Sequence, residues 1–372
     1  MTAGRPLRIA LVHPHSWPEV RRGGERYLAD LAWYLRGAGH DVHVLTGTDG
    51  VSRAAMEDGV DVRRIRHLRA AAFERRGLST DDTFGAAVLP QLLRRRFDVV
   101  HALTPTAAIA ARLAGQRTVF TVIGHPSAGH LERTPKDRRL FGAAIRIATR
   151  TMALSRASAG AVRELFGHPA GVLPPGIRLD QFPPELAART GPPRVLFSAA
   201  ADDRRKGLPF AMEALGLLLE RRPDVRLQIS SAGDHTWAVD QLGADASRVL
   251  AATDVLGAGA LGDIPGRYRG ATVTVLPSAG EAFGLALVES LASGTPAVCS
   301  RGGGMPEIVD SDDVGRTVTH GDPAALAAAL DEVIALAADP ATPARCAAHA
   351  VRWGWIETVG PMHESVYREV AR

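Results

Sequence analysis

Short, mostly apolar runs that alternate with helical patterns constrain the fold of this chain more than any other feature of its sequence. Leu7–Val12 is such a run, and Glu25–Arg36 follows it with apolar residues at helical spacing. Further runs lie at Val42–Leu45, Val99–Ala102 and Thr118–Ile123. Alternation of this kind predicts a parallel, doubly wound α/β sheet in the first part of the chain, residues 1–172.

A proline-rich stretch separates this pattern from a second one. Pro174, Pro175, Pro183, Pro184, Pro192 and Pro193 lie between residues 173 and 194. Because proline cannot donate in a helix or a sheet ladder, the stretch predicts a linker. The alternation then resumes, with strands expected at Val195–Ser198, Arg226–Ser230, Val273–Leu276 and Ala297–Ser300 and helices at Leu208–Glu220, Leu285–Ser293 and Pro323–Ala338.

The resumed pattern predicts a second Rossmann-like domain, residues 195–354, followed by a last helix in residues 355–372. Ligands of open α/β sheets bind beyond the carboxyl ends of the strands. We therefore expect the site in a cleft between the two domains.

Composition limits the class of protein. Of the 372 residues, 46% are hydrophobic and 23% charged, which is typical of a globular protein. Cys299 and Cys346 form neither a Cys-x-x-Cys pair nor a cluster with histidines, so we expect no disulfide framework and no zinc site. The first apolar run is too short to span a membrane, and no signal peptide is visible. We expect a cytoplasmic protein.

Charge is distributed unevenly along the chain. Residues 1–180 carry 27 basic and 16 acidic side chains, and the remainder carries 17 and 24. The basic half is suited to an anionic acceptor, an anionic membrane face or nucleic acid, and it equally fits a solvated surface in an arginine-rich sequence. We favour peripheral membrane contact, for which Arg133–Arg150 is the candidate segment, over nucleic acid.

The segment from Leu276 to Glu289 is the most informative for chemistry. It is a strand end, a turn of small residues that includes Ser278, and a helix start. Phe283, Gly284 and Leu285 would present unpaired backbone N–H groups at the helix N-terminus, where the macrodipole favours negative charge. This geometry is suited to a diphosphate.

Two carboxylates flank that turn. Glu281 comes just before the helix and Glu289 lies within it. Because carboxylates accept hydrogen bonds from adjacent hydroxyls, Glu289 could hold a nucleotide ribose and Glu281 a donor sugar. The alternative is that both are helix-terminal acids that interact only with solvent and the helix dipole.

A lysine follows the first strand of the second domain. The only lysines among 44 basic residues are Lys136 and Lys206, and Lys206 lies in the sequence Asp-Asp-Arg-Arg-Lys-Gly. Retention of lysine here indicates a need for a compact ammonium group. Its role would be to neutralise charge that develops on a departing diphosphate.

Two glycine-rich turns complete the candidate site. Gly303 and Gly304 follow the strand that ends at Ser300, and could cradle the donor sugar. Gly23 and Gly24 open the first helix and could contact the acceptor or a donor phosphate, although a glycine pair alone often marks only a turn.

In the order and chemistry of these motifs the chain resembles glycosyltransferase family 4, whose members have the GT-B fold of two Rossmann-like domains. The resemblance spans nearly the whole chain. It implies a retaining, metal-independent transfer from a UDP- or GDP-linked hexose, with no cofactor beyond that donor. It also implies Lys206 on the diphosphate, Glu289 on the ribose, Glu281 on the donor sugar and a last helix that returns to the first domain.

Two departures from the family pattern concern individual residues. The family arginine that precedes the lysine is replaced by Ala200 and Ala201, so either Arg204 or Arg205 takes its part or activity is altered. The family histidine after the fourth predicted strand is slightly displaced. His125 is our candidate for it, with His13 and His130 as alternatives.

Several rival interpretations remain. Gly257–Gly262 matches a dinucleotide fingerprint but comes late in its domain, and Asp310 and Asp312 imitate a metal-binding pair within a polar turn. Other readings are a phosphorylase or sugar-phosphate synthase on the same scaffold, or a non-catalytic protein that binds sugar nucleotides. The sugar, the base and the acceptor, which could be a lipid, a polysaccharide or a small molecule, are not fixed by any motif.

Overall fold

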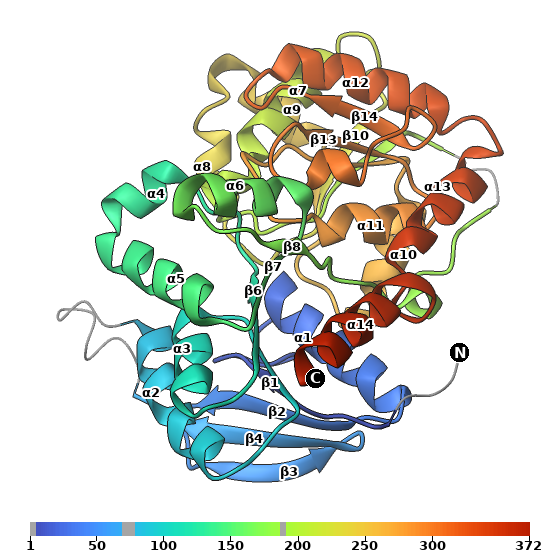
Figure 1. Cartoon of the computed structure of the whole chain (residues 1–372). Helices are drawn as coiled ribbons and strands as arrows, with labels where there is room; N and C mark the ends of the chain where they lie inside the picture. The colour runs from blue at the N-terminus through green and yellow to red at the C-terminus, as the bar shows by residue number, and fades with distance from the viewer. Residues whose placement is uncertain (1–4, 69–78, 187–190) are drawn as a thin grey trace. The chain divides into compact units, whose positions relative to one another are not determined.

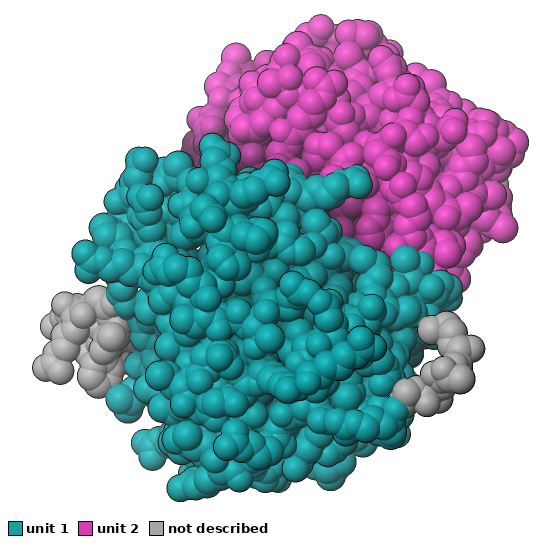
Figure 2. Space-filling model, in the orientation of Figure 1, with its two compact units in different colours: residues 1–176, 355–372 teal, residues 177–354 magenta. Residues whose placement is uncertain are grey.

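The computed structural model of the chain describes residues 5–68, 79–186 and 191–372. It divides into two compact units, residues 1–176 with 355–372 and residues 177–354 (Figure 2). The first unit therefore contains both ends of the chain. Most of the proline-rich stretch, from residue 177 on, is assigned to the second unit.

The first unit is built on an eight-stranded sheet with the order β3-β4-β2-β1-β5-β6-β7-β8 (Figure 1). Its strands are β1 (Arg8–Val12), β2 (Asp41–Thr48), β3 (Arg53–Glu57), β4 (Val60–Arg66), β5 (Val99–Ala102), β6 (Thr118–Val122), β7 (Arg150–Ala153) and β8 (Gly171–Val172). All neighbours pair in parallel except β3 and β4. Parallel strands are buried on both faces, which explains the apolar runs in the sequence.

Helices cover both faces of this sheet. They are α1 (Gly23–Gly37), α2 (Thr80–Leu93), α3 (Pro105–Leu113), α4 (Ala128–Arg133), α5 (Pro135–Ile147), α6 (Arg156–Phe166) and α14 (Gly360–Ala371). Helix α3 packs against α2 and α5, whereas α1 packs against α14 (Figure 1). A capping box of Ser79 and Asp82 satisfies the first amides of α2.

Residues 355–372 pack on the first unit through buried polar groups. After a turn of π-helix (Trp355–Val359), α14 lies against β5 and β6. The ring nitrogen Nε2 of His363 lies 2.8 Å from the Tyr27 hydroxyl, and Nδ1 of His101 lies 2.6 Å from the Tyr367 hydroxyl. Burial lowers the pKa of His363 to about 4 and that of His101 well below its usual value.

The second unit has a six-stranded parallel sheet with the order β11-β10-β9-β12-β13-β14. The strands are β9 (Arg194–Phe197), β10 (Arg226–Ile229), β11 (Thr253–Val255), β12 (Val273–Leu276), β13 (Ala297–Ser300) and β14 (Gly315–Val318). Its helices are α7 (Leu208–Leu218), α8 (Thr236–Val239), α9 (Ala246–Ala251), α10 (Ile264–Gly270), α11 (Leu285–Ala292), α12 (Pro323–Leu336) and α13 (Thr342–Ala350).

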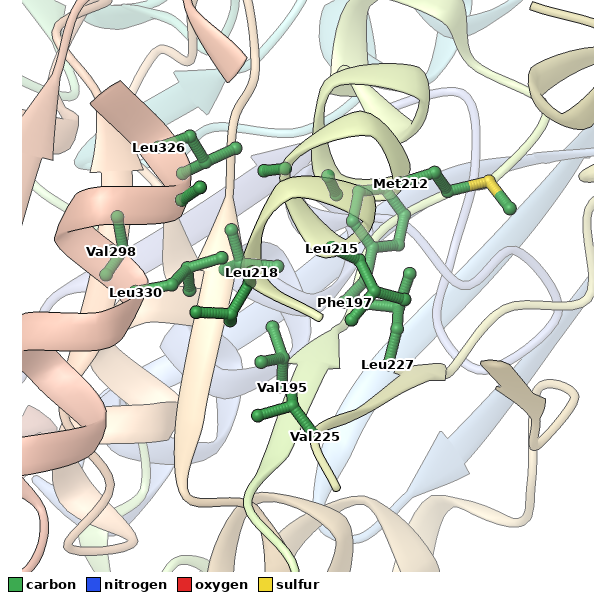
Figure 3. Close-up of a cluster of buried hydrophobic side chains, with 14 of the residues drawn as sticks. Val195, Phe197, Met212, Leu215, Leu218, Val225, Leu227, Val298, Leu326 and Leu330 are labelled. Atoms are coloured by element: carbon green, nitrogen blue, oxygen red, sulfur yellow. The ribbon is translucent and has the colours of Figure 1, made fainter. Parts of the chain in front are cut away.

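The apolar core of the second unit lies between its sheet and the pair α7 and α12 (Figure 3). Val195 and Phe197 point from β9 toward this layer, where they meet Leu215 of α7, and Leu330 of α12 lies in the same cluster. Helix α10 contacts both β9 and α11. This packing fixes the position of the strand ends that carry the site.

The prediction of two doubly wound sheets is confirmed, and all strands expected from the sequence are present. Sequence analysis missed the short strands β7, β8, β11 and β14 and the hairpin of β3 and β4. All five residues of β3 are exposed, so burial leaves no apolar pattern in that strand.

Candidate functional site

The site residues predicted in the second unit lie at the carboxyl edge of its sheet. The strand order reverses between β9 and β12, and this is the topological switch point at which open α/β sheets bind ligands. The loop after β9 carries Lys206 and the loop after β12 carries Glu281. Gly303 follows β13, the next strand along, so three neighbouring strand ends contribute.

The Lys206 loop is fixed by its own backbone. Asp203 caps a 3-10 turn, Arg204–Lys206, by accepting from the Arg205 amide at 3.0 Å. The carbonyl of Arg205 accepts from the Ala279 amide at 2.8 Å, which ties this loop to the one after β12. Gly207 ends the turn at a φ of +74°, and a Cβ there would collide with the Pro277 carbonyl oxygen. Glycine is therefore required at position 207.

Lys206 and Glu281 form an ion pair. Lys206 Nζ lies 2.6 Å from Glu281 Oε1, and both side chains are about one-fifth exposed. The pair is therefore accessible to a ligand while partly shielded from water. A diphosphate that displaced the Glu281 carboxylate would meet the ammonium directly.

The glycine-rich turn after β13 holds the Glu281 loop in place. The Gly304 amide donates to the Glu281 carbonyl at 2.8 Å. Gly303 has a φ of +60°, and any Cβ there would overlap the same carbonyl oxygen. These glycines allow the loop after β13 to approach the Glu281 loop closely. Nothing in the structure tests whether they also cradle the donor sugar, so that role stays a prediction.

The N-terminus of α11 presents free amides. Gly284 is the N-cap residue and no side chain caps the helix. Within the part of the chain that the structure describes, the amides of Phe283, Gly284 and Leu285 donate to no protein acceptor. Phe283 is buried, with its ring edge-on to Trp353 at a centroid distance of 6.3 Å. Unpaired amides at a helix N-terminus attract an anion.

Ser278 is buried in the same turn. Its hydroxyl has no hydrogen-bond partner among the described residues. Burial of an unpaired hydroxyl carries a free-energy cost, which a hydrogen bond to a bound ligand would offset. The assignment of Ser278 to donor binding stays a prediction.

Glu289 lies on the buried side of α11. Only 7% of this residue is exposed, and its Oε2 accepts a hydrogen bond of 2.9 Å from the hydroxyl of Tyr268 on α10. Glu289 is thus not a solvated helix-terminal acid. Sequence analysis missed Tyr268. The only feature that could have indicated it is its place in a short helix directly before the buried strand β12.

The two arginines beside Lys206 already have partners. The guanidinium of Arg204 lies over the ring of Trp237, 4.8 Å from the centroid. Arg205 is exposed and bonds to Asp203 at 3.1 and 2.7 Å, which lowers the pKa of that carboxyl and raises that of the guanidinium. Arg205 also interacts electrostatically with Glu281, and among the described residues neither arginine forms a hydrogen bond with that carboxylate.

The other predicted site residues belong to the first unit. Gly23 and Gly24 start α1, and a Cβ on Gly24 would lie 3.0 Å from the Ile123 side chain in the loop after β6. The same loop carries His125, whose Nδ1 lies 3.1 Å from the Ser158 hydroxyl. Burial lowers the pKa of His125, which favours the neutral imidazole.

His13 and His130, the alternatives to His125, lie in different parts of the first unit. His13 follows β1 and is buried, which lowers its pKa to about 4. Asp81, at the start of α2, interacts electrostatically with His13, and burial raises the pKa of this carboxyl. Sequence analysis missed Asp81. His130 belongs to α4, and its side chain lies outside the described residues.

The Gly257–Gly262 segment and Asp310, which resemble a dinucleotide fingerprint and part of a metal-binding pair, make structural contacts. Arg267 of α10 donates to the carbonyls of Leu256 and Gly257 and so holds the Gly257–Gly262 segment. Asp310 accepts from Arg352 at 3.0 and 3.1 Å and lies 3.1 Å from His349. Cys299 and Cys346 are both buried and are not joined in a disulfide, and burial raises the pKa of Cys299 to about 12.

The candidate membrane segment, Arg133–Arg150, turns its apolar face inward. Gly142, Ala144 and Ile145 of α5 are buried. Lys136, Arg139 and Arg146 of the same helix are exposed, and Lys136 forms an ion pair with Asp82 of α2. Within the described ranges, no helix combines the length and hydrophobicity that a membrane crossing requires.

Comparison with known proteins places this fold and site in a class. Residues 21–181 match the model of Glycosyltransferase Family 4, and residues 192–335 match that of Glycosyl transferases group 1. The chain is 30% identical to phosphatidyl-myo-inositol mannosyltransferase of Mycobacterium tuberculosis, over 89% of this chain and 87% of that protein. It is 29% identical to D-inositol 3-phosphate glycosyltransferase of Acidothermus cellulolyticus, over 95% and 88% of the two chains.

Solved structures show the same fold. Sucrose-phosphate synthase of Thermosynechococcus elongatus matches with a TM-score of 0.81 and 19% identity, over 97% of this chain and 98% of that one. Anabaena HepE, in complex with UDP and glucose, matches with a TM-score of 0.73 and 19% identity over 97% and 99%. The chain is a glycosyltransferase of the GT-B type. It belongs to the glycosyltransferase family 4 proteins, as its motifs predicted.

Proposed function

We propose that this glycosyltransferase moves a hexose from a UDP- or GDP-linked donor to an acceptor hydroxyl, with retention of configuration and without a metal or other cofactor. The observation that carries the proposal is the Lys206–Glu281 pair, 2.6 Å apart, at the switch point of the second sheet. The free amides at the start of α11 supply a second set of donors for the same diphosphate.

Each residue has a role that its chemistry supports. Lys206 and the α11 amides would stabilise charge on the leaving diphosphate, and Glu281 would accept hydrogen bonds from the donor sugar. Glu289 would hold the ribose. That these groups would supply positive charge to the diphosphate supports a reaction without a metal ion. An acceptor that attacks from the side of the departing phosphate would preserve the anomeric configuration.

A nucleotide-sugar donor is supported by the solved relatives. Anabaena HepE was crystallised with UDP-glucose as well as with UDP and glucose. The mycobacterial and Acidothermus relatives are named for phosphatidyl-myo-inositol and for D-inositol 3-phosphate. We therefore propose inositol phosphates and phosphatidylinositol as the first acceptors to assay. His125, Gly23 and Gly24 would contribute the acceptor side from the first unit.

Calorimetric titration of the full chain with UDP-, GDP- and ADP-sugars tests the proposal. We expect one donor series to bind, and Lys206→Ala to weaken that binding at least tenfold. Lys136→Ala, which removes the only other lysine, is the matched control and should bind as the wild type does. Failure of all three series to bind would reject the proposal. Release of the nucleoside diphosphate that depends on inorganic phosphate rather than on an acceptor would indicate a phosphorylase.

We also propose that the exposed basic face of α5 contacts anionic lipid when the acceptor is a lipid. Because the apolar face of α5 is packed inside the first unit, the contact would be electrostatic and weakened by salt. Sedimentation with vesicles of anionic and of neutral phospholipid, at low and high salt, measures it. Equal binding to both kinds of vesicle would exclude this role.

A further inference from the structure

We propose that Tyr268 is a positioning residue that orients the Glu289 carboxylate for the nucleotide ribose. This inference rests on the proposed function, because it takes Glu289 as the ribose ligand. Tyr268 lies on α10, outside the loops of the candidate site, and is 1% exposed. No motif in the sequence singled it out.

The hydrogen bonds around Tyr268 have a defined direction. Its hydroxyl lies 2.9 Å from Glu289 Oε2 and 3.1 Å from the hydroxyl of Ser198. A phenol has one proton, and an ionised carboxylate can only accept. The proton therefore goes to Glu289, and the Ser198 hydroxyl donates to the phenol oxygen. The chain of bonds runs from the end of β9 through α10 to α11.

Tyr268 is itself held rigidly. Its carbonyl accepts from the Thr295 hydroxyl at 2.7 Å, and its ring contacts that of Phe182 with centroids 6.2 Å apart. The whole residue is enclosed by protein. A fixed donor of this kind restricts rotation of the carboxylate that it bonds.

The carboxylate needs such a donor. Only 7% of Glu289 is exposed, so water provides little solvation of its carboxylate. Buried charges are costly unless they are hydrogen-bonded. One bond from Tyr268 uses one of about four acceptor positions on a carboxylate, a group that can accept from several donors at once, adjacent ribose hydroxyls included.

Two roles for Tyr268 make different predictions. If it serves only to stabilise the buried carboxylate, its loss should weaken the binding of any nucleotide to a similar degree. If it orients Glu289 toward the ribose, removal of its hydroxyl should weaken the binding only of ligands that carry both ribose hydroxyls. The distinction requires ligands that differ only in those hydroxyls.

Calorimetry on the full chain would compare UDP, GDP and ADP, and then the 2′-deoxy and 3′-deoxy forms of the one that binds. We expect Tyr268→Phe to weaken the ribonucleotide about tenfold, as loss of a charge-assisted hydrogen bond does, and the deoxy forms less than twofold. In a Glu289→Gln background the same change should add nothing. Tyr27→Phe, which removes a buried hydroxyl in the first unit, is the matched control and should have no effect.

Equal weakening of ribonucleotide and deoxynucleotides, an undiminished effect in Glu289→Gln, or unchanged binding would each overturn the inference while leaving the proposed function intact. Absence of nucleotide binding by the wild type would overturn both. Should Tyr268→Phe fold poorly, Ser198→Ala tests the same chain of bonds. We then expect a smaller loss of ribonucleotide affinity with the same selectivity, and equal losses for all ligands would reject the inference.

Discussion

The carboxyl edges of the two sheets differ in how their polar groups are charged. In the first unit, His13 follows β1, His67 follows β4 and His125 follows β6, and burial lowers the pKa of all three. In the second unit, the corresponding edge carries the ion pair of Lys206 and Glu281 beside unpaired amides. The same architecture thus presents several histidines with lowered pKa values at one edge and an ion pair beside unpaired amides at the other.

This difference shows that net charge does not locate the anion site. The first 180 residues carry the excess of basic side chains, whereas the candidate phosphate site lies in the acidic remainder of the chain. The proposed site relies on one ammonium and a few oriented amides at a helix N-terminus, because the local field rather than the net charge attracts an anion. The histidines at the edge of the first unit, whose pKa values burial lowers, are suited to hydrogen bonds with hydroxyl groups.

Loss of Lys206 should have the largest effect on the charged edge. We expect Lys206→Ala to lower the transfer rate by about 10²- to 10³-fold, the usual loss when one preorganised electrostatic group is removed. Steady-state release of the nucleoside diphosphate in the presence of acceptor measures it. With a water-soluble inositol phosphate as acceptor, Lys136→Ala should retain the wild-type rate. A Lys206→Ala enzyme with a near-normal rate would show that the amides alone carry the diphosphate.

Gly207→Ala should destabilise the same edge. The substitution forces a side chain into a left-handed conformation and against the Pro277 carbonyl, with an expected cost of about 3 kcal/mol. Urea denaturation gives the free energy of unfolding. Gly243→Ala is the control, because its φ is +55° but no atom lies near its Cβ, so it should lose only about 1 kcal/mol. Equal losses would mean that the contact with Pro277 relaxes at no cost.

His125→Asn tests the carboxyl edge of the first sheet. We expect turnover to fall about 10- to 100-fold, the rate equivalent of one lost hydrogen bond. Nucleotide affinity should not change, because the donor residues lie in the second unit. Rates with acceptor and calorimetric affinities separate the two quantities, with His168→Asn as the matched histidine control. A weakened nucleotide affinity would assign His125 to the donor instead.

Mild acid should weaken the first unit. His363 is buried with its pKa lowered to about 4, so the unfolded chain binds more protons than the folded one between that value and about 6.5. Its stabilising contribution is complete above pH 6.5 and is lost as the pH falls toward 4. At pH 5.5 this histidine alone should cost about 1 kcal/mol relative to pH 7.5.

Urea denaturation at several pH values, followed by tryptophan fluorescence, measures this loss, because the Trp355 ring lies 5.3 Å from that of His363. His363→Gln removes the titrating group and should flatten the pH dependence even if it lowers stability throughout. His168→Asn should leave the slope unchanged. A slope that His363→Gln does not alter would assign the acid sensitivity to other groups.

Much of this protein was determined by the sequence alone. The spacing of apolar runs predicted both sheets, because parallel strands buried on two faces must be almost wholly apolar. Motif order predicted the family, and the Lys206, Glu281 and Glu289 positions fall where the strand order reverses in the second sheet. These features are local in the chain, and local patterns are what a sequence records directly.

Only the tertiary structure decided which groups meet. Nothing in the sequence pairs Lys206 with Glu281, 75 residues apart, or aims the Tyr268 hydroxyl at Glu289. It also decided that Gly304 bonds to the Glu281 carbonyl and that burial lowers the pKa of His125 and of His363. Contacts and protonation depend on packing between distant segments, and no local pattern encodes the depth at which a side chain will be buried.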